Sequence, residues 1–267
     1  MSDLKTTVLA TLAGLFTASA SGKIVVENGH ETPNQKVREY KFEQKEKSDT
    51  VADFNKANTT NPKILNIGDS RTVGMYFSQN KDKYSNAVNT TDVSGNQWFA
   101  KVGQGLKWFK DNFATLQKHA KNNDIIVINL GINDLSTLAD SKVQAEKYLK
   151  LLNELADDLS KDGKVMFFSS VNPVGPQYKN YRLFNKKIDD FNQHMREGLS
   201  DKIYYIDTNS YIKDKLQYKC FDKYGLHYTS SINKSIYSYI EESVYKQWKN
   251  IKCNNLMHYY KTQQREL

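Results

Sequence analysis

Short apolar runs and longer segments with apolar residues at helical spacing alternate from residue 61 to about residue 250. The run DIIVINLG at 124–131 is nearly continuous, which is typical of a strand buried on both faces of a sheet. The apolar runs predict strands at 63–68, 100–102, 124–131, 164–174 and 202–208. The helical spacing predicts helices at 70–80, 105–120, 141–160, 181–199 and 231–251.

Strictly alternating strands and helices indicate an α/β fold with a central parallel sheet. Right-handed crossovers between parallel strands place helices on both faces of such a sheet. Binding and catalytic sites in these folds form at the carboxyl ends of the strands. The polar residues that follow the predicted strands are therefore the first candidates for chemistry.

The N-terminal part of the chain has a different composition. Lys5, the apolar run 6–16 and the small residues up to Ala20 match a secretory signal over 1–20, which predicts a secreted or extracytoplasmic protein. A short amphipathic helix of a cytoplasmic protein is the alternative. Residues 21–60 are polar without periodicity and predict a linker or N-terminal arm. The domain is expected over 61–250, followed by a C-terminal tail at 251–267.

Charge and cysteine content narrow the class of protein. The net charge of +8 comes overwhelmingly from Lys, while Arg, the residue preferred for bidentate phosphate and base recognition, occurs only five times. We therefore expect a solvated basic surface and no nucleic-acid binding. No segment has the length of a membrane span, so no stable membrane insertion is expected. Cys220 and Cys253 could form one disulfide bridge if the protein is exported.

Two polar residues follow the first and third predicted strands. Ser70 stands at a strand-to-helix turn, where a serine can serve as a nucleophile or simply cap the helix. Asn133 follows the strand at 124–131, and its amide can donate to a developing oxyanion or stabilise a turn. If the two strands are neighbours, these side chains lie at the same edge.

Two glycines and one histidine complete the set of candidates. Gly103 and Gly105 follow the second strand, where a glycine lets a backbone N–H approach a substrate or permits a tight turn. His227 lies in the loop that follows the strand at 202–208 and precedes the last helix. No histidine pairs with Cys, Asp or another His at metal-ligand spacing, so we expect neither a metal nor a cofactor.

These residues also carry a resemblance to a known family. The stretches NIGDSRTVGM around Ser70, AKVGQGLKWF around Gly103, LGINDL around Asn133 and YGLHYT around His227 resemble the four blocks of the SGNH (GDSL-type) hydrolases. The segments SSVNPV and FNKKIDDFNQHM resemble bacterial secreted members. The resemblance extends over about 61–250 and implies a flavodoxin-like three-layer α/β/α sandwich.

The resemblance also implies an activity and roles for the matching residues. The chain is expected to be a serine esterase, in which Ser70 attacks the ester carbonyl and His227 takes and returns the proton. The backbone N–H of Ser70, the N–H of Gly103 and the side chain of Asn133 would hold the oxyanion, with Gly105 as the competing glycine. The implied substrate is a small-molecule or polysaccharide ester. A carbohydrate O-acetyl group is among the esters that the family hydrolyses.

One position departs from the family pattern. The family usually carries Asp three residues before the histidine, but Tyr224 occupies that place and Asp222 lies five residues before it. We favour Asp222 as the catalytic acid, which could reach back if the loop bends at Gly225. As an alternative, a backbone carbonyl could hold the histidine. The third alternative is a site that binds without catalysis, which would make the chain a carbohydrate- or wall-binding module. An O-acyltransferase with the same nucleophile is a further alternative.

Two aromatic pairs flank the glycine block. Trp98, Phe99, Trp108 and Phe109 could stack on a sugar ring, but their spacing favours a role in the core. The two interpretations give opposite expectations for the burial of these side chains.

Overall fold

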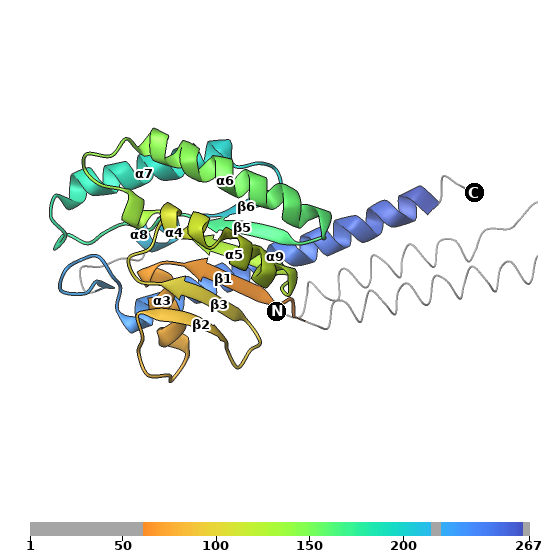
Figure 1. Cartoon of the computed structure of the whole chain (residues 1–267), viewed down its shortest axis with the longest axis horizontal. Helices are drawn as coiled ribbons and strands as arrows, with labels where there is room; N and C mark the ends of the chain where they lie inside the picture. Colours follow the sequence, from red (N-terminus) through yellow and green to blue (C-terminus); the bar gives the residue numbers. More distant parts are fainter. Residues whose placement is uncertain (1–60, 215–219, 264–267) are drawn as a thin grey trace, which may run out of the picture. The chain divides into compact units, whose positions relative to one another are not determined.

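The computed structural model describes residues 61–214 and 220–263, with side chains up to residue 252. Within these residues six strands form one sheet, flanked by helices (Figure 1). The strands are β1 (Ile64–Gly68), β2 (Ala87–Thr91), β3 (Gln97–Lys101), β4 (Ile125–Asn129), β5 (Val165–Ser169) and β6 (Ile203–Ile206). The helices are α3 (Ser70–Gln79), α4 (Leu106–Asp111), α5 (Phe113–Lys121), α6 (Ser141–Lys161), α7 (Tyr181–Gly198), α8 (Thr208–Lys213) and α9 (Ser230–Gln263).

The strand order in the sheet is β2-β3-β1-β4-β5-β6. Five strands, β3-β1-β4-β5-β6, run parallel in the flavodoxin-like order, which confirms the predicted class. The strand order reverses between β1 and β4, and loops at such a switch point open into a crevice. A sixth strand that the sequence did not predict, β2, pairs antiparallel with β3 at one edge of this parallel sheet.

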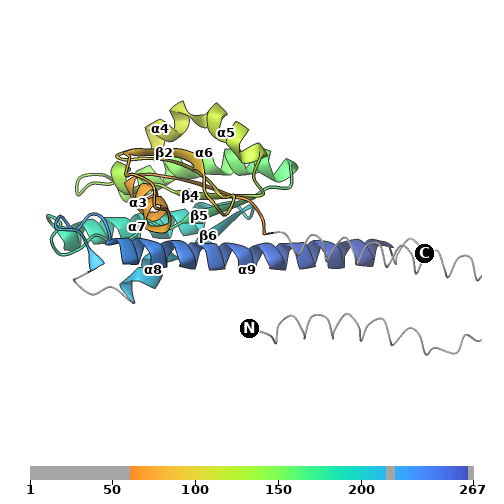
Figure 2. The ribbon, with the colours of Figure 1, turned by 90° about the horizontal axis from the view of Figure 1, so that it is seen from below.

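Each face of the sheet buries its own apolar core, as alternation along the strands requires. Leu65, Ile67, Ile126 and Ile128 point into a cluster with α4, α5, α6 and α7. Ile64, Trp98, Ile125 and Val127 point into a second cluster with α3, α8 and α9. Figure 2 shows α4 and α5 on one side of the sheet and α8 and α9 on the other. The expected three-layer sandwich is confirmed.

Several elements differ from their predicted bounds. The second strand covers Gln97–Lys101 instead of 100–102, and the helix predicted at 105–120 is two helices that meet at Asn112. The Asn112 side-chain amide donates to the carbonyl oxygen of Trp108, which satisfies an acceptor at the end of α4. The tail predicted from residue 251 begins inside α9, which continues to Gln263.

Some predictions fall outside the described residues. The signal segment at 1–20 and the arm at 21–60 lie there and stay predictions. Cys220 is a free cysteine in the structure, and the side chain of its predicted partner at position 253 is not among those described. No helix in the described part of the chain combines the length and the apolar character that crossing a membrane requires.

Candidate active site

Ser70 is the first residue of α3 and follows β1 directly. The preceding Asp69 is the N-cap of α3, and its carboxylate accepts a hydrogen bond from the Arg71 backbone N–H at 2.9 Å. Gly68 makes this sharp turn feasible, because a Cβ there would lie 1.8 Å from Thr72 Oγ1 and 2.7 Å from the Asn129 carbonyl oxygen. Ser70 itself stays partly exposed. The turn therefore presents a serine hydroxyl at the carboxyl edge of the sheet.

Burial changes the acidity of the capping carboxyl group. Asp69 is almost completely buried, and loss of hydration raises its pKa to about 6, although the Arg71 backbone N–H and the Arg71 charge act in the opposite direction. The charge of Asp134 adds to the rise. A neutral form of Asp69 is therefore accessible near pH 6.

His227 lies in a short hairpin between residues 220 and 229. An isolated bridge joins Phe221 to Tyr228, and the Thr229 N–H donates to the Cys220 carbonyl oxygen at 3.0 Å. The Asp222 N–H donates to the His227 carbonyl oxygen at 2.9 Å. Gly225 turns the chain at φ +72°, and a Cβ there would lie 2.8 Å from the Tyr178 backbone nitrogen. The hairpin therefore brings residues 222 and 227 side by side.

A continuous chain of polar contacts links Ser70, His227 and Asp222. His227 Nε2 lies 3.0 Å from Ser70 Oγ, and His227 Nδ1 lies 3.2 Å from Asp222 Oδ2. Ser70 lies 157 residues before His227, whereas Asp222 lies only five residues before it. The order and distances of the three groups match the nucleophile, base and orienting acid of a serine hydrolase.

The second oxygen of the Asp222 carboxylate is occupied by the hairpin backbone. Oδ1 accepts hydrogen bonds from the N–H groups of Tyr224 at 3.1 Å and Leu226 at 3.2 Å. This local fixation turns Oδ2 toward the imidazole. The Tyr224 side chain is 64% exposed, and the Lys223 ammonium lies over its ring. Of the three alternatives for the Tyr224 departure, the structure shows the arrangement in which Asp222 reaches His227.

Asn133 and the two glycines meet at the loops after β4 and β3. Asn133 belongs to a short 3₁₀ turn, is exposed, and donates through Nδ2 to the Gln104 carbonyl oxygen at 2.8 Å. Gln104 stands between Gly103 and Gly105, so this bond joins the two loops. Because β3 and β4 both pair with β1, these loops and Ser70 open at the same edge.

Positions 103 and 105 require glycine for different structural reasons. Gly103 has φ +73° with open space around the position of a Cβ, so its backbone conformation requires glycine. Gly105 has an extended backbone, and a Cβ there would lie 2.2 Å from Asp134 Oδ2. Gly105 is thus required by close packing against Asp134, whereas the exposed Gly103 remains the better candidate for a substrate-facing N–H.

Three polar residues near the site were not identified from the sequence: Asp134 is partly buried, and Tyr148 and Arg71 are buried. Asp134 accepts hydrogen bonds from the Leu106 N–H at 2.9 Å and from the Tyr148 hydroxyl. Burial, followed by the charge of Asp134, raises the pKa of Tyr148 well above its usual value. Arg71, which directly follows Ser70, is also buried. A charged residue in the apolar stretch of α3, and an acid directly after Asn133, were the available signals.

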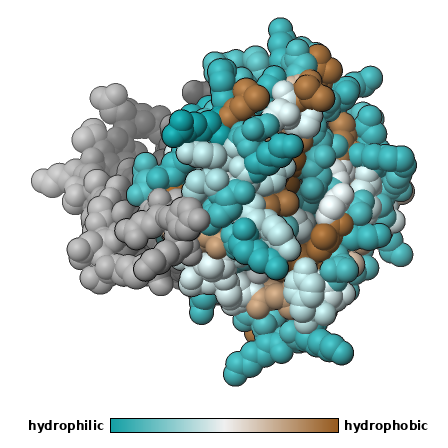
Figure 3. Space-filling model, turned by 90° about the vertical axis from the view of Figure 1, so that its left-hand side faces the viewer, coloured by the Kyte–Doolittle hydropathy of each residue, from teal (hydrophilic) through white to brown (hydrophobic). Residues whose placement is uncertain are grey.

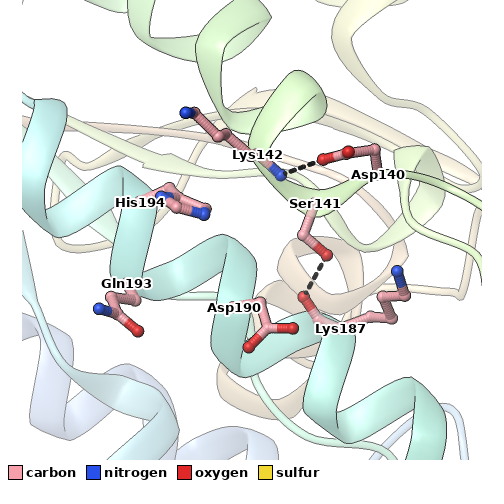
Figure 4. Close-up of a pocket in the computed structure, with 7 residues that line it drawn as sticks. All are labelled: Asp140, Ser141, Lys142, Lys187, Asp190, Gln193 and His194. Carbon is pink, nitrogen blue, oxygen red and sulfur yellow. Dashed lines mark hydrogen bonds between the residues drawn. The ribbon is translucent and has the colours of Figure 1, made fainter.

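The remaining aromatic and polar features lie away from this chain of contacts. Trp98 and Phe109 are fully buried, which confirms their core role, and Phe99 stacks on Trp108 at 5.2 Å between ring centroids. A polar cavity of about 170 Å³ lies between the start of α6 and α7, and its lining includes Asp140, Ser141 and His194 (Figure 4). The lining of this cavity includes none of the predicted site residues.

The surface at the carboxyl edge of the sheet mixes hydrophilic and apolar side chains (Figure 3). Leu138, Leu183 and Tyr224 are large apolar or aromatic side chains that are exposed. Among the described residues, no group of three or more His, Cys, Asp or Glu side chains is placed to hold a metal ion.

Comparisons with known proteins extend this description. The model of the GDSL-like Lipase/Acylhydrolase family matches residues 67–234, which is more than half of the chain. No curated protein sequence matches the chain.

Three solved structures are similar in fold at low sequence identity. A lipase/acylhydrolase from Enterococcus faecalis has a TM-score of 0.52 at 14% identity, over 69% of this chain and 96% of its own. The lipase Lip_vut3 from a goat rumen metagenome has a TM-score of 0.50 at 16% identity, over 69% and 98%. An acetyl esterase variant with an acetate ion has a TM-score of 0.51 at 12% identity, over 71% and 99%.

The family match spans the Ser70 turn, the loops that follow β3 and β4, and the His227 hairpin. The predicted membership is thereby confirmed: the chain belongs to the GDSL-like lipase/acylhydrolase family and is an ester-hydrolysing enzyme.

Proposed function

We propose that the chain hydrolyses a carboxylic ester through an acyl-enzyme on Ser70. The observation that supports this proposal best is the contact chain from Ser70 Oγ through the His227 imidazole to the Asp222 carboxylate. In the reactive tautomer, Nδ1–H donates to Asp222 Oδ2, and Nε2 accepts the proton of the serine hydroxyl as Oγ attacks the carbonyl carbon. The imidazolium then returns this proton to the departing alcohol.

The second half of the reaction uses the same groups. Water attacks the acyl-enzyme, His227 takes a proton from that water, and Ser70 regains its hydroxyl when the acid departs. The oxyanion of both tetrahedral intermediates would be held by the N–H of Ser70, the N–H of Gly103 and the Asn133 amide. The 2.8 Å bond from Asn133 Nδ2 to the Gln104 carbonyl oxygen uses one amide hydrogen, so the second remains for the oxyanion.

We propose a short acyl group, such as an O-acetyl group on a carbohydrate, as the substrate. The similar fold of an acetyl esterase supports this choice only at the level of fold. Phe99 and Trp108 stack on each other, are partly buried and flank the glycine loop in the sequence, and an aromatic surface of this kind could contact a sugar ring. Export, as predicted from residues 1–20, would bring the enzyme to extracellular or wall glycans.

The mechanism is tested by turnover of p-nitrophenyl acetate together with labelling of Ser70 by a fluorophosphonate. Ser70→Ala should lose labelling and reduce turnover to background. Asp222→Asn should lower kcat by at least about 10²-fold, because an amide no longer favours the required tautomer. Full activity of Ser70→Ala would refute the acyl-enzyme, and full activity of Asp222→Asn would refute the role of the acid.

The substrate class requires a separate measurement. A panel of p-nitrophenyl esters from acetyl to decanoyl, together with acetylated xylan, should give the highest kcat/KM for the shortest acyl chains and release acetate from the polysaccharide. A preference for long acyl chains would overturn the proposed substrate while leaving the mechanism intact. Binding of glycan without labelling or turnover would favour the non-catalytic module instead.

A further inference from the structure

Arg71 is a buried cation placed directly after the proposed nucleophile. Arg71 is only 4% exposed, yet no carboxylate of the described residues lies within ion-pair distance of its guanidinium group. Burying an unpaired guanidinium is costly unless its N–H groups find other acceptors. The acceptors of Arg71 are backbone carbonyl groups, and they come from two different loops.

The first loop follows β5. Arg71 Nη1 donates to the Asn172 carbonyl oxygen at 2.6 Å, and Nη2 lies 3.3 Å from the Pro173 carbonyl oxygen. The Tyr228 hydroxyl donates to the same Pro173 carbonyl group, and the Arg71 guanidinium lies 5.4 Å from the Tyr228 ring centroid. Arg71 and Tyr228 therefore hold this loop from two sides.

The second loop is the hairpin that carries the proposed base. Arg71 Nη2 donates to the carbonyl oxygen of Leu226 at 3.1 Å, and Leu226 directly precedes His227. The hairpin also meets the loop after β5 through the Gly175 N–H, which donates to the Gly225 carbonyl oxygen at 2.7 Å. The residue beside the nucleophile thus holds the residue beside the base.

We infer that Arg71 is a positioning residue that sets the distance between Ser70 and His227. The inference rests on the proposed function. The contacts inside the hairpin fix Asp222 against His227, but they leave its placement relative to α3 undetermined. Arg71 supplies this placement, because the guanidinium is a planar fork that can hold carbonyl groups of both loops at once. Its burial keeps it away from the substrate, so its effect must pass through His227.

The first test measures the rate of Ser70 labelling by a fluorophosphonate and the turnover of p-nitrophenyl acetate. Arg71→Met should lower the labelling rate and kcat by about 10²-fold with little change in KM, because a misplaced base affects chemistry more than binding. Arg71→Lys should lower the labelling rate and kcat by about tenfold, since an ammonium can reach only some of the carbonyl oxygens that the guanidinium contacts. Arg182→Met is the matched control, because Arg182 is an exposed residue that contacts the Tyr181 ring, and it should match wild type.

A double-mutant cycle separates positioning from general damage to the fold. In a His227→Ala background, Arg71→Met should lower the labelling rate by less than about threefold further, because the group through which it acts is gone. An equal loss in both backgrounds would overturn the inference. Unchanged labelling in Arg71→Met, or a rise in KM with unchanged kcat, would also overturn it.

Hydrogen exchange tests the placement without any chemistry. The amides of Asp222 and Thr229, which are hydrogen-bonded in the hairpin, should exchange faster in Arg71→Met, whereas the amides of β4 should exchange as in wild type. Unchanged hairpin exchange, or a global increase that includes β4, would overturn the inference. If wild type shows neither labelling nor turnover, the proposed function fails, and the exchange result still decides whether Arg71 holds the hairpin.

Discussion

Asp69 predicts an unusual dependence of stability on pH. Burial raises its pKa from 3.8 to about 6 in the folded protein. Between these two values the folded state binds more protons than the unfolded state, so the free energy of unfolding falls as the pH rises. The loss of stability that results from burying the ionised Asp69 carboxylate is complete above about pH 6 and absent below the unfolded pKa. Asp69→Asn removes the titration and keeps a good N-cap for α3.

The magnitude follows from the shift. A difference of about two pKa units corresponds to about 3 kcal/mol, because each unit is worth 1.36 kcal/mol. No discount for solvent screening applies, since the side chain is fully buried. The stability of Asp69→Asn minus that of wild type should therefore rise by about 3 kcal/mol between pH 3.5 and pH 7.

Urea unfolding at a series of pH values measures this difference. Asp140→Asn is the matched control, because Asp140 is the exposed N-cap of α6. Hydrogen bonds from the backbone N–H groups of Val143 and Lys142 lower the pKa of Asp140, although slight desolvation opposes them. The stability that Asp140 contributes is present above its unfolded pKa and lost as the pH falls through its folded pKa. The stability of Asp140→Asn minus that of wild type should therefore fall as the pH rises, opposite to the rise expected for Asp69→Asn. A difference for Asp69→Asn that stays constant with pH would refute the reasoning.

Three further predictions concern activity and packing. Tyr224→Phe should keep kcat/KM for p-nitrophenyl acetate within about twofold, because the ring is exposed and Asp222 contacts the histidine; a tenfold loss would contradict this assignment. Trp98→Ala should lower the urea-measured free energy of unfolding by about 3–5 kcal/mol, since the side chain is fully buried, and a loss below about 1 kcal/mol would contradict its core role. Gly131→Ala should lower the thermal stability by more than Gly163→Ala. Both glycines have positive φ, but only at Gly131 would a Cβ meet a side chain, at 2.7 Å from Val171 Cγ2. Equal losses of stability would contradict this close approach.

The apolar pattern predicted the parallel part of the fold because those strands are buried on both faces. The strands β1, β4 and β5 are buried at every position, so each appears in the sequence as an apolar run. The strand β2 was missed because only Val88 of its residues is buried. Edge strands depend on pairing with a neighbour, which leaves little trace in the local sequence. The six-residue helix α8 was missed because it is too short to show periodicity.

The site was predictable where residue type and strand end coincide. Ser70, Asn133 and His227 each follow a strand of the parallel sheet, and their edge could be deduced from topology. Asp222 was favoured as the partner of His227, but a backbone carbonyl group stayed open as an alternative, because the choice depends on how the backbone of a short hairpin bends. Arg71 was missed for a related reason, since its acceptors are carbonyl groups, which every residue possesses and no sequence pattern reveals.

The hairpin that joins Asp222 to His227 has a consequence for surveys of sequence collections. A search that requires an acid three residues before the histidine would classify this chain as lacking the acid. The hydrogen bond from the Asp222 N–H to the His227 carbonyl oxygen pairs the two residues across the hairpin, so a spacing of five brings the carboxylate to the ring. Members that keep an acid beside the histidine should thus be told apart from members that lack one by the closeness of the two residues across the turn, and not by a fixed number of residues between them.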